Sequence, residues 1–412
     1  MTPGFLWKDR SFNLFWVGQT LSTTGDAFTA VAIPLLLYKS TGSIAKMTAI
    51  TACSAVGAAA SGLVAGALVD RVDRRKLLLW TDLGRAFLMA TVPLAGVLGV
   101  LSFPLLAVVA ALMGLLGNTF GIGYVAFVPE LVTGAHVMAA NTRLQGTEAA
   151  SYVIGPALAG VVVQAWGPET AVGIDALSFL ASFASLLAVR ARATTASRAE
   201  DECSWATGLA RGARFILDLP PLRTVVLFMC LEILATAAAL DMFTFHLKAT
   251  LAQSDERVGT MFAIASVGGI AGAALSALVR RRLGMHGTYV ATAFGLALAF
   301  GLVTFAGSFA MTALVAVLFT FSSTMRRVLS MTRRQELTPD RLLGRVTAAF
   351  WLATSAAKML GAYAVGLVAG HYGNVEASQT TAVFLLVLAV ATIPARSLNT
   401  PASRADHGPS RP

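Results

Sequence analysis

Charged residues are scarce in this chain. Only 13% of its 412 residues are Asp, Glu, Lys or Arg, whereas 56% are hydrophobic, and the mean hydropathy is +0.72. A soluble chain of this length needs far more polar surface than this composition offers. The net charge of +10 could indicate nucleic-acid binding in a soluble domain, but basic patches interleaved with aromatic residues are missing. The composition therefore indicates a membrane protein.

The residue patterns of common enzymes are lacking as well. The three cysteines, Cys53, Cys203 and Cys230, are far apart, and the five histidines are scattered, which argues against a disulfide framework or a metal site. The chain has no G-x-S-x-G, H-E-x-x-H or C-x-x-C pattern, and none of its six lysines follows a glycine, so the phosphate-binding G-x-x-x-x-G-K loop is absent. We therefore expect no enzyme activity, no use of ATP, no cofactor and no metal.

Long apolar runs are what the sequence has in abundance. Runs of about 18 to 25 apolar residues are long enough to cross the hydrocarbon layer of a membrane. The first run is too long, and too polar in its middle, for a removable signal peptide. Twelve such runs predict membrane-spanning helices, near 12–38, 44–69, 77–101, 104–127, 139–166, 170–189, 223–246, 258–279, 288–306, 309–328, 344–370 and 379–395.

The distribution of Lys and Arg predicts the orientation of these spans. If both termini lie in the cytoplasm, 25 of the 31 cations fall in cytoplasmic segments, and only Lys39, Lys46, Lys248 and Arg257 fall in outside loops. Cytoplasmic loops normally hold this excess. We therefore expect a multi-pass protein of the cell (inner) membrane with both termini in the cytoplasm.

A polar stretch in the middle of the chain divides it into two similar halves. GLVAGALVDR at 62–71 aligns with GAALSALVRR at 272–281, and GPALAGVVVQAWG at 155–167 aligns with GAYAVGLVAGHYG at 361–373. Repeated halves with a binding site between them are typical of secondary transporters. The expected organisation is a first bundle at 1–189, a cytoplasmic linker at 190–222, a second bundle at 223–395 and a disordered cytoplasmic tail at 396–412.

Four stretches identify a family resemblance. They are FNLFWVGQTLSTTGDAF, GALVDRVDRRKLLLWTDLGRA, PELVTGAHVMAANTRLQGTEAASYVIGPALAG and LTPDRLLGRV. With the twelve predicted spans, the chain resembles the major facilitator superfamily of transporters, in particular its bacterial drug and siderophore exporters. The resemblance implies an all-α membrane fold with twelve helices in two pseudo-symmetric six-helix bundles around a central cavity.

The fifth predicted span carries a motif similar to that of this superfamily's antiporters. The motif residues are Gly146, Gly155, Pro156 and Gly160, although Ser151 and Ala159 stand where the pattern usually has glycine. Small residues permit close helix contacts, and proline bends a helix. We interpret the stretch as a bent packing surface between the halves; ordinary small-residue packing is the alternative.

Placing an ionisable side chain inside a membrane span costs free energy, so each such residue is a candidate for a functional or structural role. Asp26 lies in TLSTTGDAFTA, a polar patch that includes Gln19 and that favours a water-filled cavity over lipid. Its carboxyl group is a candidate for binding and releasing a proton. A hydrogen bond between helices is the alternative role.

Two further carboxylates belong to opposite halves. Glu148 and Glu232 each lie deep in a predicted span and could face a shared cavity, where they would bind protons or a cationic substrate; alternatively, either pairs statically with Arg143 or Lys358. Lys358 could neutralise a carboxylate or attract an anionic substrate. Asp241 and His246 lie near the outer end of the seventh predicted span and are weaker candidates.

Asp82 and Arg85 are three residues apart, which predicts a structural ion pair on one helix face.

The loop GALVDRVDRRK at 66–76 is the candidate conformational gate. Asp70 would lie at the negative end of a helix dipole, so it needs another stabilising partner. The resemblance implies that this aspartate meets the start of the helix at 342–346 when the cytoplasmic side is closed; a solvated loop is the alternative. The gate residues are Gly66, Asp70, Arg71, Asp73, Arg74, Arg75 and Arg345.

Together these features predict a proton-coupled antiporter that exports a small amphipathic compound by alternating access. A siderophore exporter of the same fold is an alternative, and a membrane sensor or assembly protein that does not transport is a rival from another class. The expected partners are a small-molecule substrate, protons and the lipid bilayer, without nucleic acid, and the protein is expected to function as a monomer.

Overall fold

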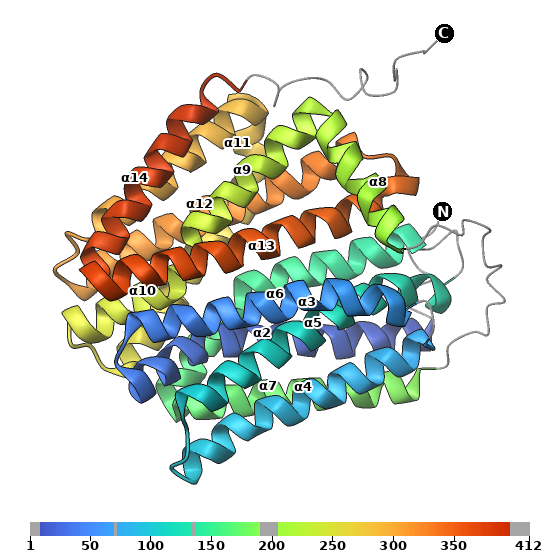
Figure 1. Cartoon of the computed structure of the whole chain (residues 1–412), viewed down its shortest axis with the longest axis horizontal. Coiled ribbons are helices and arrows are strands. Elements are labelled where there is room, and N and C mark those ends of the chain that lie inside the picture. Colours follow the sequence, from blue (N-terminus) through green and yellow to red (C-terminus); the bar gives the residue numbers. More distant parts are fainter. Residues whose placement is uncertain (1–8, 70–71, 133–136, 190–204, 396–412) are drawn as a thin grey trace. The chain divides into compact units, whose positions relative to one another are not determined.

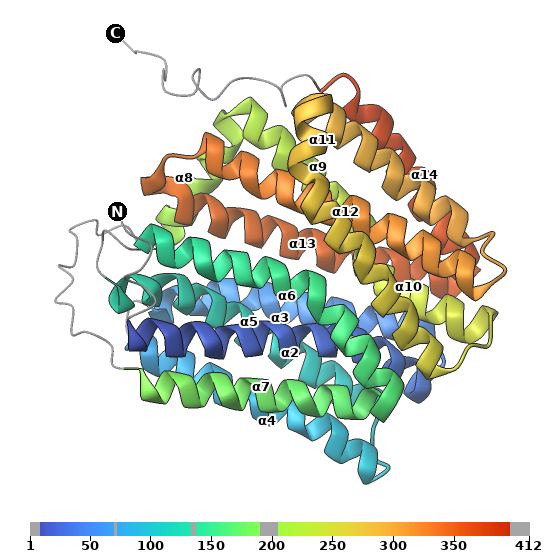
Figure 2. The same ribbon diagram turned by 180° about the vertical axis from the view of Figure 1, so that it is seen from behind.

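The computed structural model describes residues 9–69, 72–132, 137–189 and 205–395, which are helical apart from short connections (Figures 1 and 2). The chain forms two compact units. The first comprises Met1–Cys203 with Gln253–Ala263, and the second comprises Ser204–Ala252 with Ile264–Pro412. The all-helical fold expected from the sequence is confirmed, and the predicted gate residues Asp70 and Arg71 lie outside the described residues.

The first unit contains six long helices. Within it α2 packs against α6 and α7, α4 packs against α5 and α7, and α3 packs against α5 (Figures 1 and 2). This arrangement brings α2, α4 and α7 together although they are distant in the sequence. The helices are α2 (Arg10–Thr41), α3 (Ile44–Val69), α4 (Arg74–Val97), α5 (Phe103–Leu131), α6 (Val137–Trp166) and α7 (Pro168–Ala188).

The second unit begins within the predicted linker. Helix α8 (Trp205–Asp218) occupies part of that linker and packs on α13, which also contacts α9 and α14. The seventh predicted span is a helix interrupted near residue 237 that ends in a π-helical turn, His246–Thr250. The other helices are α9 (Pro220–Thr236), α10 (Ala239–Phe245), α11 (Asp255–Val303), α12 (Phe309–Leu337), α13 (Asp340–Tyr372) and α14 (Asn374–Thr392).

Ten described helices are long and apolar enough to cross a membrane. The eighth and ninth predicted spans are joined in α11, where Gly284 takes a left-handed conformation with φ of 72° and forms a kink. The fifth span corresponds to α6, whose described apolar part, Ile154–Trp166, is short. These two differences account for ten candidates where the sequence predicts twelve spans.

Helix α4 has the inside-out pattern of a membrane helix. Trp80 and Phe87 lie on its outer face and are 70% and 72% exposed, whereas Asp82 and Arg85 are buried. In a soluble protein the apolar side chains would occupy the core. Lipid around the helix reverses this preference, and polar groups inside the bundle must find partners there.

One pair of helices and an ion pair repeat between the two halves with an offset of 206 residues. Helix α5 spans 103–131 and α12 spans 309–337, so both ends differ by 206 residues. Ser102 and Ser308 are extended N-caps at these two helix starts. An ion pair also repeats: Arg74 lies 2.9 Å from Glu130, and Arg280 lies 2.7 Å from Glu336. These correspondences support the duplication inferred from the sequence.

Glycine sets the close approach of α3 and α5. A Cβ atom at Gly57 would overlap the carbonyl oxygen of Ala111, and one at Gly114 would overlap that of Ser54. Because the two overlaps are reciprocal, the backbones meet directly at this crossing. Such contacts let helices associate without a hydrophobic driving force in lipid.

Candidate functional site

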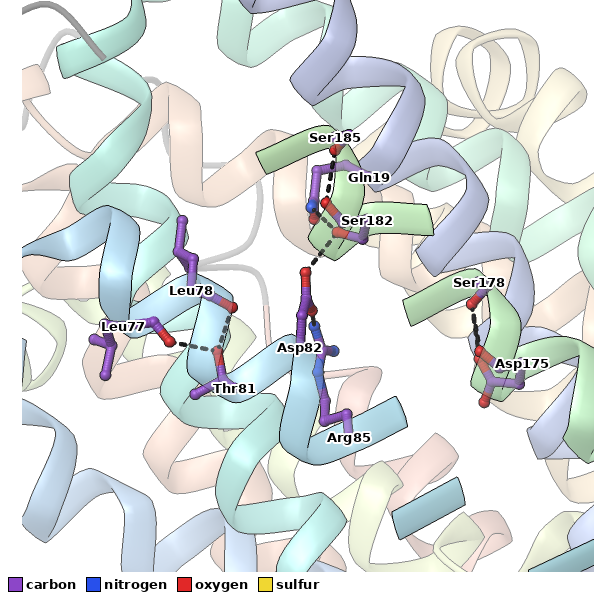
Figure 3. Close-up of polar contacts among 10 residues, drawn as sticks. All are labelled: Gln19, Leu77, Leu78, Thr81, Asp82, Arg85, Asp175, Ser178, Ser182 and Ser185. Atoms are coloured by element: carbon purple, nitrogen blue, oxygen red, sulfur yellow. Dashed lines mark hydrogen bonds and ion pairs between the residues drawn. The ribbon is translucent and has the colours of Figure 1, made fainter. Parts of the chain in front are cut away.

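A buried polar network connects α2, α4 and α7 in the first unit. Asp82 forms an ion pair with Arg85, and its other carboxylate oxygen accepts a 2.6 Å hydrogen bond from Ser182 Oγ. Gln19 Nε2 donates to the same hydroxyl oxygen at 2.9 Å (Figure 3). Asp82 and Ser182 are fully buried. The ion pair predicted from the three-residue spacing is therefore present, and Gln19 belongs to this network.

Two aromatic rings hold the arginine of the network. The Arg85 guanidinium carbon lies 4.2 Å from the centre of the Phe120 ring and 4.4 Å from that of Phe179. Cation–π contacts of this kind stabilise a desolvated guanidinium. Arg85 is therefore fixed by a carboxylate and two rings, and it provides a permanent positive charge inside the first unit.

Asp175 is the site residue that sequence analysis missed. Its carboxylate is fully buried on α7 and accepts hydrogen bonds from the Thr29 hydroxyl and, at 3.1 Å, from Ser178 Oγ. Gly25 leaves space for this contact, because a Cβ atom there would overlap Ser178 Oγ and approach Asp175 Oδ1. The available signal was an aspartate inside the apolar run at 170–189.

Asp26 adjoins this contact and has a different environment. Its side chain is exposed, and it interacts electrostatically with Arg85, Asp82 and Asp175. One fixed cation and three carboxyl groups therefore act on one another inside the first unit. This places Asp26 where a change in its protonation alters the electrostatic balance of the network.

The polar patch around Asp26 serves mainly for contacts between helices. Gln19 bonds to Ser182 on α7, and the hydroxyls of Thr23 and Thr24 lie 3.3 and 3.1 Å from Ser151 Oγ on α6. These side chains therefore have partners on neighbouring helices, and the expectation that the patch borders a water-filled cavity stays a prediction.

The start of α6 contacts α2 through Arg143. This residue lies within α6, as the predicted span at 139–166 implies, with its guanidinium 3.9 Å from the centre of the Trp16 ring and a 3.0 Å hydrogen bond to Asn13. Glu148, one turn further, is half-buried and interacts electrostatically with Tyr124. Its proposed role in binding protons or cations stays a prediction.

In the second unit, Glu232 is part of a buried ion pair. Its partner is Arg326, which is 1% exposed and also donates a 2.8 Å hydrogen bond to the Tyr289 carbonyl oxygen. The sequence analysis offered Arg143 or Lys358 as static partners and did not consider Arg326, which lies near the end of the predicted span at 309–328. The partner is corrected to Arg326, because α12 continues to Leu337 and buries this side chain. Lys358 is exposed on α13 and interacts electrostatically with Asp241.

The described part of the candidate gate is tied to its own bundle. Asp73 caps α4 by accepting a 2.9 Å hydrogen bond from the Lys76 N–H, and Arg74 pairs with Glu130. Arg75 donates 3.0 and 2.8 Å hydrogen bonds to the carbonyl oxygens of Leu186 and Leu187, at the end of α7. Cations suit this position because the C-terminus of a helix is its negative end.

Other gate residues have separate positions. Gly66 lies within α3. Arg345 lies within α13, and its backbone carbonyl is so close to Gly212 of α8 that a Cβ atom there would overlap it. Both stay candidates for the gate on the strength of the sequence alone.

The antiporter-like motif of the fifth predicted span lies on α6 and forms a packing surface there. A Cβ atom at Gly155 would lie 2.5 Å from Ala27 Cβ on α2, and one at Gly160 would overlap the carbonyl oxygen of Gly259. Pro156 lies within α6, and Gly146 is exposed. The packing role expected for the motif agrees with these contacts.

These features define a class of protein: a multi-pass helical membrane protein with repeated halves and a buried network of charges. Comparison with known sequences identifies the family within this class: the profile of the Major Facilitator Superfamily matches residues 15–362. The chain belongs to this superfamily of secondary transporters, which confirms the family resemblance and the expectation of a transporter that is not an enzyme.

Relatives and solved structures are similar over much of the chain. The multidrug efflux pump Tap of Mycolicibacterium fortuitum is 24% identical over 68% of this chain and 70% of its own. Macrolide efflux protein A of Streptococcus pyogenes is 25% identical over 45% of each chain. The crystal structure of the nucleoside transporter NupG has a TM-score of 0.71 and 12% identity, and the match covers 94% of this chain and 99% of that one. The structural match concerns the fold alone.

Proposed function

We propose that this protein is a proton-coupled antiporter that exports a small amphipathic organic compound, such as a drug, an antibiotic or a secondary metabolite, by alternating access of its two halves. The observation that carries the proposal is the exposed Asp26 beside the buried network of Arg85, Asp82 and Asp175. Export as the direction of transport is supported by the similarity to two efflux proteins and by the antiporter-like motif on α6.

Asp26 is the proposed proton-binding group. When ionised, it is attracted by Arg85 and repelled by Asp82 and Asp175, whereas a proton removes both effects at once. Protonation therefore changes how strongly α2 is held against the charges on α4 and α7. A carboxylate that responds in this way can couple proton release to rearrangement of the bundle.

Asp175 supports this role from inside the bundle. Its hydrogen bond from Thr29 connects α7 with α2 next to Asp26, and Ser178 donates to it from within α7. Two carboxyl groups that influence each other titrate as a pair rather than independently. We therefore propose that Asp175 tunes proton binding at Asp26.

The test is export by cells that carry the Asp26→Asn variant. Asparagine keeps the size and hydrogen-bonding capacity of the side chain but removes its titratable proton. We therefore expect loss of efflux of the compounds that the parent exports, identified by susceptibility tests with varied toxic compounds, with normal protein in the membrane. Asp218→Asn is the matched control, because Asp218 is 71% exposed and forms a surface pair with Arg214. Unchanged efflux by Asp26→Asn at parental expression would exclude Asp26 from proton coupling.

A further inference from the structure

A second group of buried polar atoms lies where α11 and α12 meet in the second unit. Its members are Arg326, Tyr289, Ser330 and Arg334, which we call the arginine cluster. Arg326 and Ser330 are each 1% exposed and Tyr289 is fully buried. The cluster lies in the other half of the chain from Asp26 and does not depend on the function proposed above.

The guanidinium of Arg326 is only partly satisfied. Its Nε donates to Glu232, and its Nη1 donates to the Tyr289 carbonyl oxygen at 2.8 Å. The guanidinium carbon lies 4.7 Å from the centre of the Tyr289 ring. Within the described ranges, however, Arg326 Nη2 and the Tyr289 hydroxyl are buried and have no hydrogen-bond partner.

The rest of the cluster continues along α12. Ser330 and Arg334 follow Arg326 at four-residue intervals, so Arg334 lies about 12 Å further along the helix axis. The Arg334 guanidinium stacks 3.6 Å from the centre of the Phe350 ring. Among the residues that the structure places, Ser330 Oγ and Arg334 Nε have no hydrogen-bond partner although both atoms are buried. The Tyr289 side chain interacts with Arg326, Ser330 and Arg334, so it connects the members.

The cluster has more hydrogen-bond donors than acceptors and carries excess positive charge. A guanidinium has donors only, and a buried donor without an acceptor is strongly unfavourable. Glu232 compensates one of the two arginines, while Arg327 adds positive charge near Glu232. A nearby Arg333 is compensated separately by Glu336 at 3.2 Å. Whatever completes the cluster must therefore provide acceptors, and a negative charge is favoured over neutral water.

We propose that the arginine cluster binds one small anion, an inorganic oxyanion or the carboxylate group of an organic molecule. Its oxygen atoms would accept hydrogen bonds from Arg326 Nη2, Arg334 Nε and the hydroxyls of Tyr289 and Ser330. Arginine donors suit this chemistry because they match the oxygen atoms of carboxylates and phosphates.

The test measures thermal unfolding of the purified full-length protein in neutral detergent. Phosphate, sulfate or benzoate replaces gluconate at constant ionic strength, so that general salt effects stay equal. We expect at least one of these anions to raise the unfolding temperature in a saturable way, because a ligand that binds only the folded state stabilises it. A response to phosphate or sulfate indicates an inorganic oxyanion; a response to benzoate, but not to its neutral analogue benzamide, indicates an organic carboxylate.

Two variants assign the binding to the cluster. Tyr289→Phe keeps the ring against Arg326 and removes only the hydroxyl, and Arg334→Gln removes one charge. Each should raise the half-saturating anion concentration about tenfold or more, since hydrogen bonds to charged groups are strong. Arg214→Gln is the control, because it makes the same charge change at a side chain that is 83% exposed.

Two results would overturn the proposal. The first is an unfolding temperature of the parent that does not respond to any of the three anions, which would mean that only water completes the cluster. The second is an anion response that both cluster variants retain at the parental half-saturating concentration. If Arg334→Gln does not fold, Tyr289→Phe alone decides, because the ring and both guanidiniums remain in place.

Discussion

Replacing Glu232 by leucine should destabilise the second unit by about 3 to 5 kcal/mol, the usual cost of removing one partner from a buried ion pair. The structure explains the size of this effect. Glu232 and Arg326 are 4% and 1% exposed, so water does not replace the lost carboxylate. Arg326→Met should cost a similar amount, because it leaves Glu232 buried without its cation and removes one of the donors to the Tyr289 carbonyl oxygen, which also accepts a 3.1 Å hydrogen bond from Thr292 Oγ1.

The double variant separates the ion pair from ordinary packing. With Glu232→Leu and Arg326→Met combined, no unpaired charge is left, and hydrophobic replacement of a buried pair is often neutral or stabilising. We therefore expect the double variant to lie within about 2 kcal/mol of the parent, with the remaining cost arising from the lost hydrogen bond between Arg326 and the Tyr289 carbonyl oxygen. The coupling energy between the two substitutions should be several kcal/mol.

The assay is reversible unfolding in mixed detergent micelles, followed by circular dichroism for the parent, both single variants and the double variant. Asp218→Asn is a control, since its surface pair with Arg214 should contribute at most about 1 kcal/mol. Additive losses in the double variant would refute the argument.

In a transport assay, Glu232→Gln should reduce the transport of cationic and of neutral substrates equally, because the carboxylate is already paired with Arg326. A selective loss of transport of cationic substrates would show that Glu232 binds the substrate.

Three other substitutions test the packing and the gate. Gly25→Ala should cost about 1 to 3 kcal/mol in the same unfolding assay, because the new methyl group overlaps Ser178, whereas Gly117→Ala has no atom within 4 Å and should not destabilise. Pro156→Ala should impair export in vesicles without unfolding the protein, and full transport with unchanged leak would leave the proline with a packing role only. Asp70→Asn should raise labelling of single cysteines on the cytoplasmic side; labelling identical to the parent would exclude a latch.

The fold could be predicted because membrane insertion imposes strong rules on composition. Apolar runs of sufficient length, cations on one side and repeated sequence stretches each predict part of the architecture. The structure describes helices for all twelve runs, two of which follow one another directly and are separated only by the kink at Gly284. The sequence did not predict α8, because its 14 residues lie in a polar stretch that hydropathy marks as a linker.

The candidate site was only partly predictable. The spacing of Asp82 and Arg85 is local, so one helix suffices to predict their pairing. Thr29, which donates to Asp175, and Glu232, which pairs with Arg326, come from other helices, and periodicity does not tell which helices pack together. Arg326 also lies next to Arg327 near the end of an apolar run, a pattern typical of a loop flank. Because α12 continues across this pair, Arg326 belongs to a buried network and not to the flank of a loop.

The most direct test of the account is proton movement in proteoliposomes that contain the purified protein and a pH-sensitive dye inside. The substrate is a compound that cells with the protein tolerate better than cells without it, and it is added on the side from which it is taken up. Antiport predicts proton transfer in the opposite direction to this compound, abolished by Asp26→Asn and retained by Asp218→Asn. Substrate transport by the parent without any proton movement, or equal proton movement in Asp26→Asn, would contradict it.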